Sequence, residues 1–159
     1  MEYRKEVVNS LYRVTEKKKY SNIEIKESIF RFDNKQEKDL YVYNFYGVIE
    51  NIIFVDWVIA SYSSIKISKI NDKVLNILRL AVFQLFFNDN LSASKIVFES
   101  VDLTKKYLFK TLSNPSLTLA SIKAEGISSA AVLKAISSIS VLYSINPSFS
   151  LITGTATVW

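Results

Sequence analysis

Apolar residues recur at helical spacing over the first two thirds of the chain. In residues 3–18 the apolar positions fall on one side of a helix and the polar positions on the other. The apolar side carries Val7, Val8, Leu11 and Val14, and the polar side carries Lys5, Asn9, Tyr12, Arg13 and Glu16. This spacing predicts an amphipathic first helix.

The next two segments also have helical character. Ser21 or Asn22 can cap a short second helix, because their side-chain oxygens accept hydrogen bonds from the free amides of a first turn. Residues 36–61 contain no proline and predict one long helix, or two helices joined by a kink at Gly47. We interpret Gly47 as a place where helices pack closely rather than as a flexible hinge.

The last two predicted helices complete a bundle. Residues 74–87 are apolar around nearly the whole circumference, which is typical of a helix at the centre of a bundle. Ser92 can cap a final amphipathic helix that continues to about Tyr107. The expected fold class is therefore all-α, with about five packed helices.

The composition changes sharply near Lys110. Residues 1–110 hold 32 of the 35 charged residues, whereas residues 111–159 hold three charges and 16 Ser and Thr. We therefore expect a helical domain over 1–110 and an atypical tail over 111–159. Residues 127–145 approach the length of a membrane span, but six serines dilute their hydrophobicity, so we expect no membrane association.

The residue types that are missing exclude most catalytic chemistry. The chain has no cysteine and no histidine, which removes disulfides, thiolate nucleophiles and the commonest metal ligand and general base. It has only three glycines and no phosphate-binding glycine loop. We expect a binding module with no catalytic residues, cofactor or metal.

The charged amino terminus does not resemble a secretory signal, so the expected location is the cytoplasm.

The first helix and the turn after it carry the candidate RNA contacts. Lysine and arginine pair with phosphates, and a tyrosine ring can stack on an unpaired base. The candidates are Arg4, Lys5, Tyr12, Arg13, Lys17, Lys18 and Lys19. Because Glu2, Glu6 and Glu16 lie between them and the net charge is only +5, an ordinary solvated helix face remains the alternative.

Arg79 is a charged residue in an otherwise apolar helix. An unpaired buried guanidinium would be too costly, so its charge must reach solvent or be paired. The candidate partners are Glu99, Glu50 and Asp56. We expect a structural ion pair between Arg79 and Glu99 rather than a phosphate contact.

Several segments in the same order resemble the NusB-like family of RNA-binding domains over residues 4–107. The matching pieces are Arg4 to Tyr12, Tyr20-Ser21-Asn22, Tyr46-Gly47-Val48 with Asn51 and Asp56, Leu78 to Leu85, and Glu99-Ser100-Val101. The Tyr-Ser-Asn segment is more similar to the amino-terminal domain of ribosomal-RNA cytosine-5 methyltransferases of the RsmB/Sun type than to the free antitermination factor. The resemblance implies a helical bundle whose RNA site includes the first helix.

The sequence departs from the family pattern at two places. Lys95 and Phe98 stand where the family usually has a small residue and an asparagine, and the family's last helix is absent after Tyr107. The second departure has two alternative explanations: a broken reading frame near Lys110, or a lineage-specific tail.

The functional hypothesis is a truncated, non-catalytic amino-terminal domain of a ribosomal-RNA cytosine methyltransferase. One alternative is a NusB-type antitermination factor that acts on a nascent transcript, together with a ribosomal protein. Another is a protein-interaction module whose basic charge is incidental. The expected partner is ribosomal RNA or a nascent transcript, without specificity for DNA.

Overall fold

The computed structural model describes residues 2–63 and 65–112. All regular structure within them is helical, which confirms the all-α prediction. The elements in chain order are α1 (Glu2–Thr15), α2 (Ser21–Ser28), η1 (Ile29–Arg31), α3 (Lys35–Glu50), α4 (Ile52–Tyr62), η2 (Ile67–Lys69), α5 (Asp72–Phe87) and α6 (Ala93–Leu112). The predicted tail over 111–159 lies almost wholly outside the described residues, so it stays a prediction.

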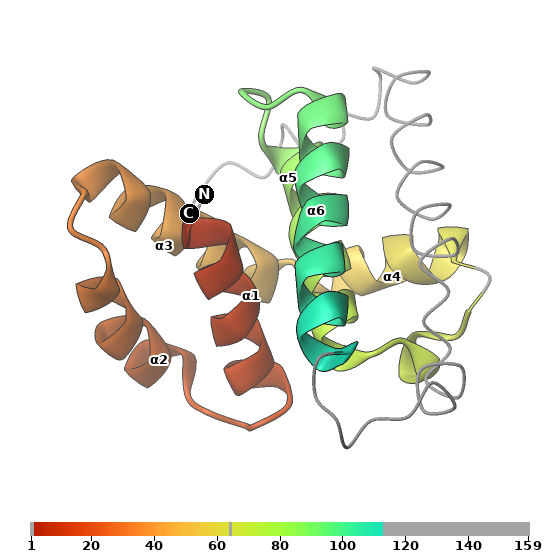
Figure 1. Ribbon diagram of the computed structural model, residues 1–159, viewed down its shortest axis with the longest axis horizontal. Helices are drawn as coiled ribbons and strands as arrows, with labels where there is room; N and C mark the ends of the chain where they lie inside the picture. Colours follow the sequence, from red (N-terminus) through yellow and green to blue (C-terminus); the bar gives the residue numbers. More distant parts are fainter. Residues whose placement is uncertain (1, 64, 113–159) are drawn as a thin grey trace.

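Helix α5 is the centre of the bundle. It packs against α1, α3, α4 and α6. In Figure 1, α1–α3 lie to the left of α5 and α6, and α4 lies to their right. Every residue from Val74 to Leu85 is buried, as the apolar circumference of this segment predicts. The outer helices bury one stripe each, and α1 contributes Val7, Val8 and Leu11 to the core.

The long apolar segment is broken at Asn51 rather than kinked at Gly47. Helices α3 and α4 meet there at an angle of 74°. The Asn51 side chain donates a hydrogen bond of 2.9 Å to the Gly47 carbonyl, and such a local side-chain bond competes with a continuous helix. The sequence left open one long helix or two joined helices; the structure has two, and the kink lies at Asn51 rather than at Gly47.

Gly47 allows α3 to approach α5 closely. A Cβ atom at this position would lie 2.1 Å from Cζ of the Phe83 ring, which is far inside van der Waals contact. The interpretation of Gly47 as a packing residue is therefore confirmed.

We expect Gly47→Ala to lower the free energy of unfolding by about 2 kcal/mol, because Phe83 sits in a packed core and must move to admit the methyl group. Urea denaturation monitored by circular dichroism measures this loss. In a Phe83→Leu background the same change should cost much less, and an equal cost in both backgrounds would contradict the steric explanation.

Within the described residues no single helix is both long and apolar enough to span a membrane. Among the described helices, the bent pair α3–α4 alone meets the length and composition criteria, and only when its two helices are counted together. The segment 127–145 lies outside the described residues.

Candidate nucleic-acid interface

Arg4 is buried, which corrects its assignment as an RNA contact. Its side chain is 4% exposed and forms an ion pair with Glu99 of α6. The reason is its position on the helix: Arg4 lies four residues before Val8 and seven before Leu11, on the face that α1 turns to the core. Arg4 therefore holds α1 against α6.

The expected Arg79–Glu99 pair was also wrong. The guanidinium of Arg79 donates two hydrogen bonds to the Asp56 carboxylate of α4, of 2.7 and 2.8 Å, and a third of 3.1 Å to Asn76. Asp56 was one of the three candidate partners. Glu99 is held by Arg4 on the opposite side of α5, so the two arginines fix different outer helices to the bundle.

Arg13 and Lys19 are engaged by carboxylates. Arg13 donates to Glu24 at 2.8 Å and to Glu6 at 2.6 Å, and Lys19 Nζ lies 2.9 Å from Glu24 Oε2 and 2.6 Å from Glu27 Oε2. Their side chains remain 30% and 27% exposed. These two cations therefore offer less positive potential to a phosphate than the sequence alone predicts.

Glu24 is the buried centre of this network. Burial acts to raise the pKa of its carboxyl group, but hydrogen bonds from Arg13, Lys19, Ser28 and Ser10 outweigh it and lower the pKa from 4.5 to about 2. Burial acts to lower the pKa of Arg13, but hydrogen bonds to Glu24 and Glu6 and their negative charges outweigh it and raise this pKa. The network thus joins the end of α1 to α2 as a charged structural unit.

Two tyrosines and two lysines form the remaining candidate site, which we call the Tyr12 cluster: Tyr12 of α1, Lys17 in the bend after α1, Lys73 of α5 and Tyr107 of α6. Lys17 Nζ lies 5.6 Å from the centre of the Tyr12 ring. Lys73 Nζ lies 5.6 Å from the Tyr12 ring and 5.0 Å from the Tyr107 ring. Both lysines are thus within cation–π range of an aromatic face.

Tyr107 connects α6 to α1 within this cluster. Its hydroxyl donates a hydrogen bond of 2.7 Å to Asn9 Oδ1. Burial, and then the negative charge of Glu6, raise the pKa of Tyr107 to about 12, so the hydroxyl stays protonated and keeps donating. The ring is therefore fixed beside Lys73.

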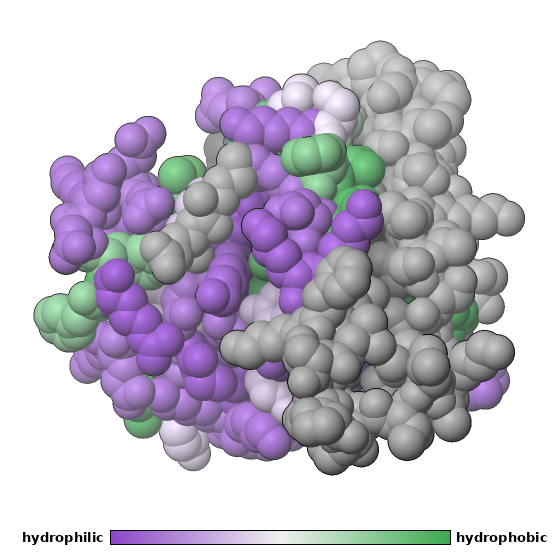
Figure 2. Space-filling view, in the orientation of Figure 1, coloured by the Kyte–Doolittle hydropathy of each residue, from purple (hydrophilic) through white to green (hydrophobic). Residues whose placement is uncertain are grey.

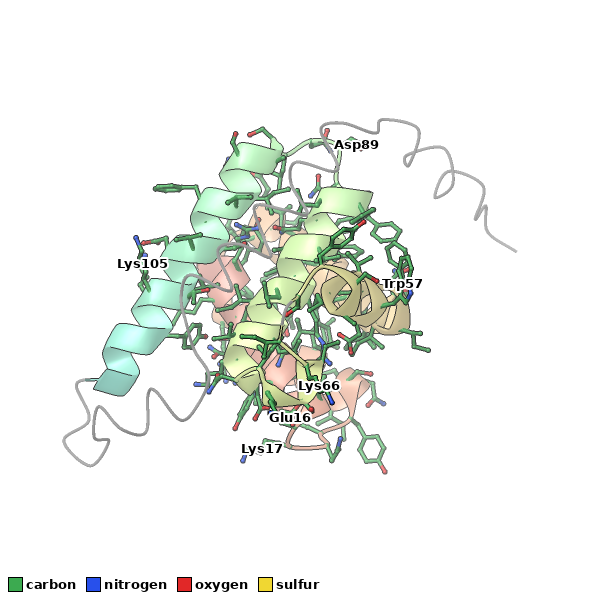
Figure 3. The ribbon with its side chains drawn as sticks, turned by 90° about the vertical axis from the view of Figure 1, so that its right-hand side faces the viewer. Glu16, Lys17, Trp57, Lys66, Asp89 and Lys105 are labelled. Carbon is green, nitrogen blue, oxygen red and sulfur yellow. The ribbon has the colours of Figure 1, made fainter. Side chains whose placement is uncertain are left out.

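Lys5 and Lys18 lie outside the cluster but remain accessible. Lys5 is exposed on α1, on the same stripe as Asn9 and Tyr12. Lys18 has a φ of 56° just after the helix and its Nζ donates to the Thr15 carbonyl at 2.7 Å. Hydrophilic residues cover most of the described surface that α1 and α6 share (Figure 2). Lys17 lies at one end of the bundle, and Lys105 projects outward from α6 (Figure 3).

The Tyr12 cluster has the chemistry that single-stranded RNA requires. Aromatic faces can stack on bases of any sequence, and mobile ammonium groups can neutralise the adjacent phosphates. Sequence reasoning found Tyr12 and Lys17 but missed Lys73 and Tyr107. No local pattern could have found them, because α5 and α6 reach Tyr12 only through the tertiary packing.

Comparison with known proteins gives the family. The NusB family model matches residues 1–114. A curated relative, the transcription antitermination protein NusB of Lachnoclostridium phytofermentans, is 30% identical over 113 residues, which cover 65% of this chain and 85% of the relative.

Two solved structures share the fold. T. maritima NusB has a TM-score of 0.69 at 18% identity, over 88% of this chain and 89% of that one. A chain from the crystal structure of a plectonemic RNA supercoil has a TM-score of 0.66 at 23% identity, over 90% of this chain and 97% of that one. At these identities the likeness establishes the fold.

Proposed function

This chain belongs to the NusB family, and on that premise we propose that it is a non-catalytic RNA-binding module of the transcription-antitermination type, acting on a nascent transcript in the cytoplasm. The observation that carries the proposal is the Tyr12 cluster, in which Lys17 and Lys73 flank two tyrosine rings contributed by α1 and α6. In this proposal Tyr12 stacks on an unpaired base, and the two lysines pair with the phosphates next to it.

The antitermination proposal has better support than the methyltransferase hypothesis. The family match and the named relative concern NusB proteins, and the relative is covered over most of its length. The methyltransferase reading is kept as a second candidate because of Tyr20-Ser21-Asn22, which begins α2. Comparing the affinity for ribosomal-RNA fragments with that for leader transcripts distinguishes the two candidates.

Binding of a fluorescein-labelled single-stranded RNA, measured by anisotropy at about 50 and 200 mM salt, tests the proposal. We expect Tyr12→Ala to weaken binding about ten-fold through loss of one stacked base, while Tyr12→Phe retains it. Lys73→Ala should reduce the slope of log affinity against log salt by about one, because one phosphate contact is lost.

Tyr62→Ala is the matched control, since Tyr62 is a partly exposed tyrosine of α4. It should leave the affinity unchanged. Absent or salt-insensitive binding by the wild-type chain would count against the proposal.

A further inference from the structure

A pocket of about 480 Å³ lies between the start of α1 and the first half of α6. Its lining includes Arg4, Lys95, Phe98, Glu99, Asp102 and Lys106. Lys95, Glu99, Asp102 and Lys106 are spaced by three or four positions and form one stripe along α6, and Phe98 lies beside Glu99. The pocket thus combines an aromatic ring with three cations and two carboxylates.

Phe98 is the unusual residue of this stripe. Its side chain is 74% exposed, whereas Phe32, Phe45 and Phe83 are buried in the core. Lys95 is also exposed. A single exposed phenylalanine is common on protein surfaces, but Phe98 lines the same pocket as Lys95 and Lys106, so an aromatic face and two cations can contact one RNA strand there.

The inner wall of the pocket holds a charged pair that is not fully hydrogen-bonded. Arg4 is 3% exposed, and its Nε and Nη2 make no hydrogen bond with any described residue. Oε1 of its partner Glu99 likewise has no hydrogen-bond partner in the described part of the chain. Two charged groups that are largely desolvated therefore border the pocket without being fully satisfied.

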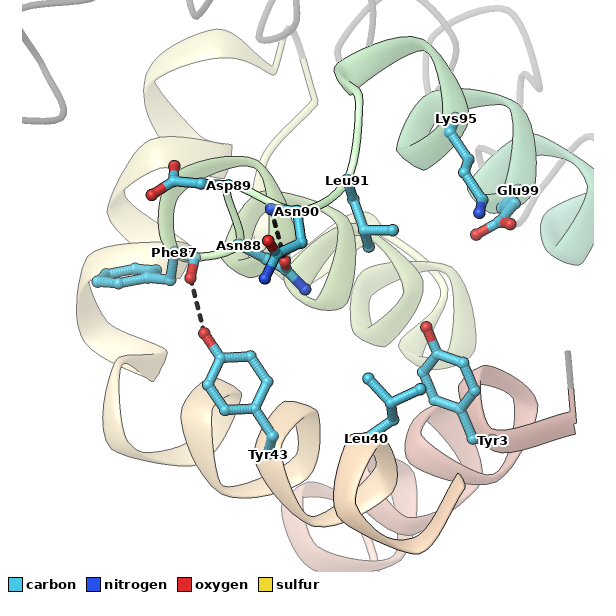
Figure 4. A pocket seen from close by; sticks show the side chains of 10 residues that line it. All are labelled: Tyr3, Leu40, Tyr43, Phe87, Asn88, Asp89, Asn90, Leu91, Lys95 and Glu99. Atoms are coloured by element: carbon cyan, nitrogen blue, oxygen red, sulfur yellow. Dashed lines mark hydrogen bonds between the residues drawn. The ribbon is translucent and has the colours of Figure 1, made fainter. Parts of the chain in front are cut away.

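A second hollow continues the pocket across α6. It has a volume of about 610 Å³ and shares Lys95 and Glu99 with the first. Its other walls carry Tyr3 of α1 and the amides of Asn88 and Asn90 in the loop before α6 (Figure 4). Side-chain amides of this kind can pair with the edges of unpaired bases.

The pocket and the Tyr12 cluster lie on the same seam between α1 and α6. These helices run side by side in the same direction (Figure 1). Two contacts show this: Arg4 meets Glu99 near the start of both helices, and Asn9 meets Tyr107 further along both. Phe98 and Tyr107 are nine residues apart, which is about 14 Å along a helix. An extended strand covers that distance in a few nucleotides.

We propose that the pocket binds a further nucleotide of the strand that contacts the Tyr12 cluster, with its base stacked on Phe98, its own phosphate beside Lys95 and the neighbouring phosphate beside Lys106. This inference rests on the proposed function and extends it, since it gives the RNA a path along the α1–α6 seam. Lys106 now pairs with Asp102 at 2.8 Å on an exposed surface, where a phosphate can compete for it.

Anisotropy titrations of the full chain with a labelled single-stranded RNA of about 12 nucleotides test this path. We expect Phe98→Ala to weaken binding about ten-fold and Phe98→Trp to preserve it. Lys95→Ala should lower the salt slope by about one. Phe30→Ala is the matched control, because Phe30 is 84% exposed in η1, away from α6, and should not change binding.

The outcomes separate the two proposals. If the wild-type chain does not bind the RNA, the proposed function fails. If the wild-type chain binds and Phe98→Ala binds equally well, only the path along α6 is overturned. If Phe98→Ala instead changes the oligomeric state in sedimentation without changing RNA affinity, the pocket receives a protein and the inference is wrong.

Discussion

Replacing Asp56 with alanine is expected to lower the free energy of unfolding by about 3 kcal/mol. The substitution leaves the Arg79 guanidinium, which is 7% exposed, with Asn76 as the remaining acceptor among its observed hydrogen bonds. A buried charge that loses its partner typically costs about 3–5 kcal/mol. The lower figure applies because Asp56 is 29% exposed and water can reach the vacated position.

Urea denaturation of the full chain at neutral pH measures this effect. Asp102→Ala is the control, because it removes an exposed pair with Lys106 on α6 and should cost no more than about 0.5 kcal/mol. Asp56→Asn should fall between the two, since its amide oxygen still accepts from Arg79. Equal stability of Asp56→Ala and Asp102→Ala would show that the Arg79 pair does not hold α4 to α5.

The helices could be predicted because each has a strong local pattern. The clearest case is α5, whose apolar residues from Val74 to Leu85 predicted a central helix and are all buried. The break at Asn51 was less predictable, because the residues on both sides are apolar and the hydrogen bond from the Asn51 side chain to the Gly47 carbonyl cannot be read from the sequence. Gly47 was the candidate kink because it is a glycine, but in the structure its missing side chain leaves room for the Phe83 ring.

The charged residues were predicted less well, because their roles depend on which helices meet. Helical spacing alone could have placed Arg4 on the core face, since it precedes Val8 and Leu11 by one and two turns. The partner of Arg79 could not be chosen in the same way. Asp56 and Glu99 both come from helices that pack against α5, and only the three-dimensional arrangement assigns Glu99 to Arg4.

The candidate site was likewise predicted in part. The polar stripe of α1 identified Tyr12, and the lysines after it identified Lys17. The glutamates that engage Arg13 and Lys19 come from α1 and α2, and their distances from the two cations depend on how these helices pack. Lys73 and Tyr107 join the cluster from helices about 60 and 95 residues later in the chain, which no short motif records.

The second large effect is an acid-dependent loss of stability centred on Glu24. In the folded state its pKa is about 2, below the ordinary value of 4.5 that applies to the unfolded chain, so unfolding takes up a proton between these two values. The stabilisation due to this carboxylate is therefore complete above about pH 5 and is lost as the pH falls to about 2. Its size at neutral pH is about 3 kcal/mol.

Glu24→Gln isolates this contribution, because it keeps the shape of the side chain and removes the charge that Arg13 and Lys19 contact. In urea denaturation at a series of pH values, the variant should be about 3 kcal/mol less stable than the wild type at pH 7, and the two should converge towards pH 2. Glu16→Gln, at an exposed position just after α1, should stay within about 0.5 kcal/mol of the wild type throughout. A difference between wild type and Glu24→Gln that stays constant across this range would mean that packing or hydrogen bonding, and not the charge of Glu24, stabilises the junction of α1 and α2.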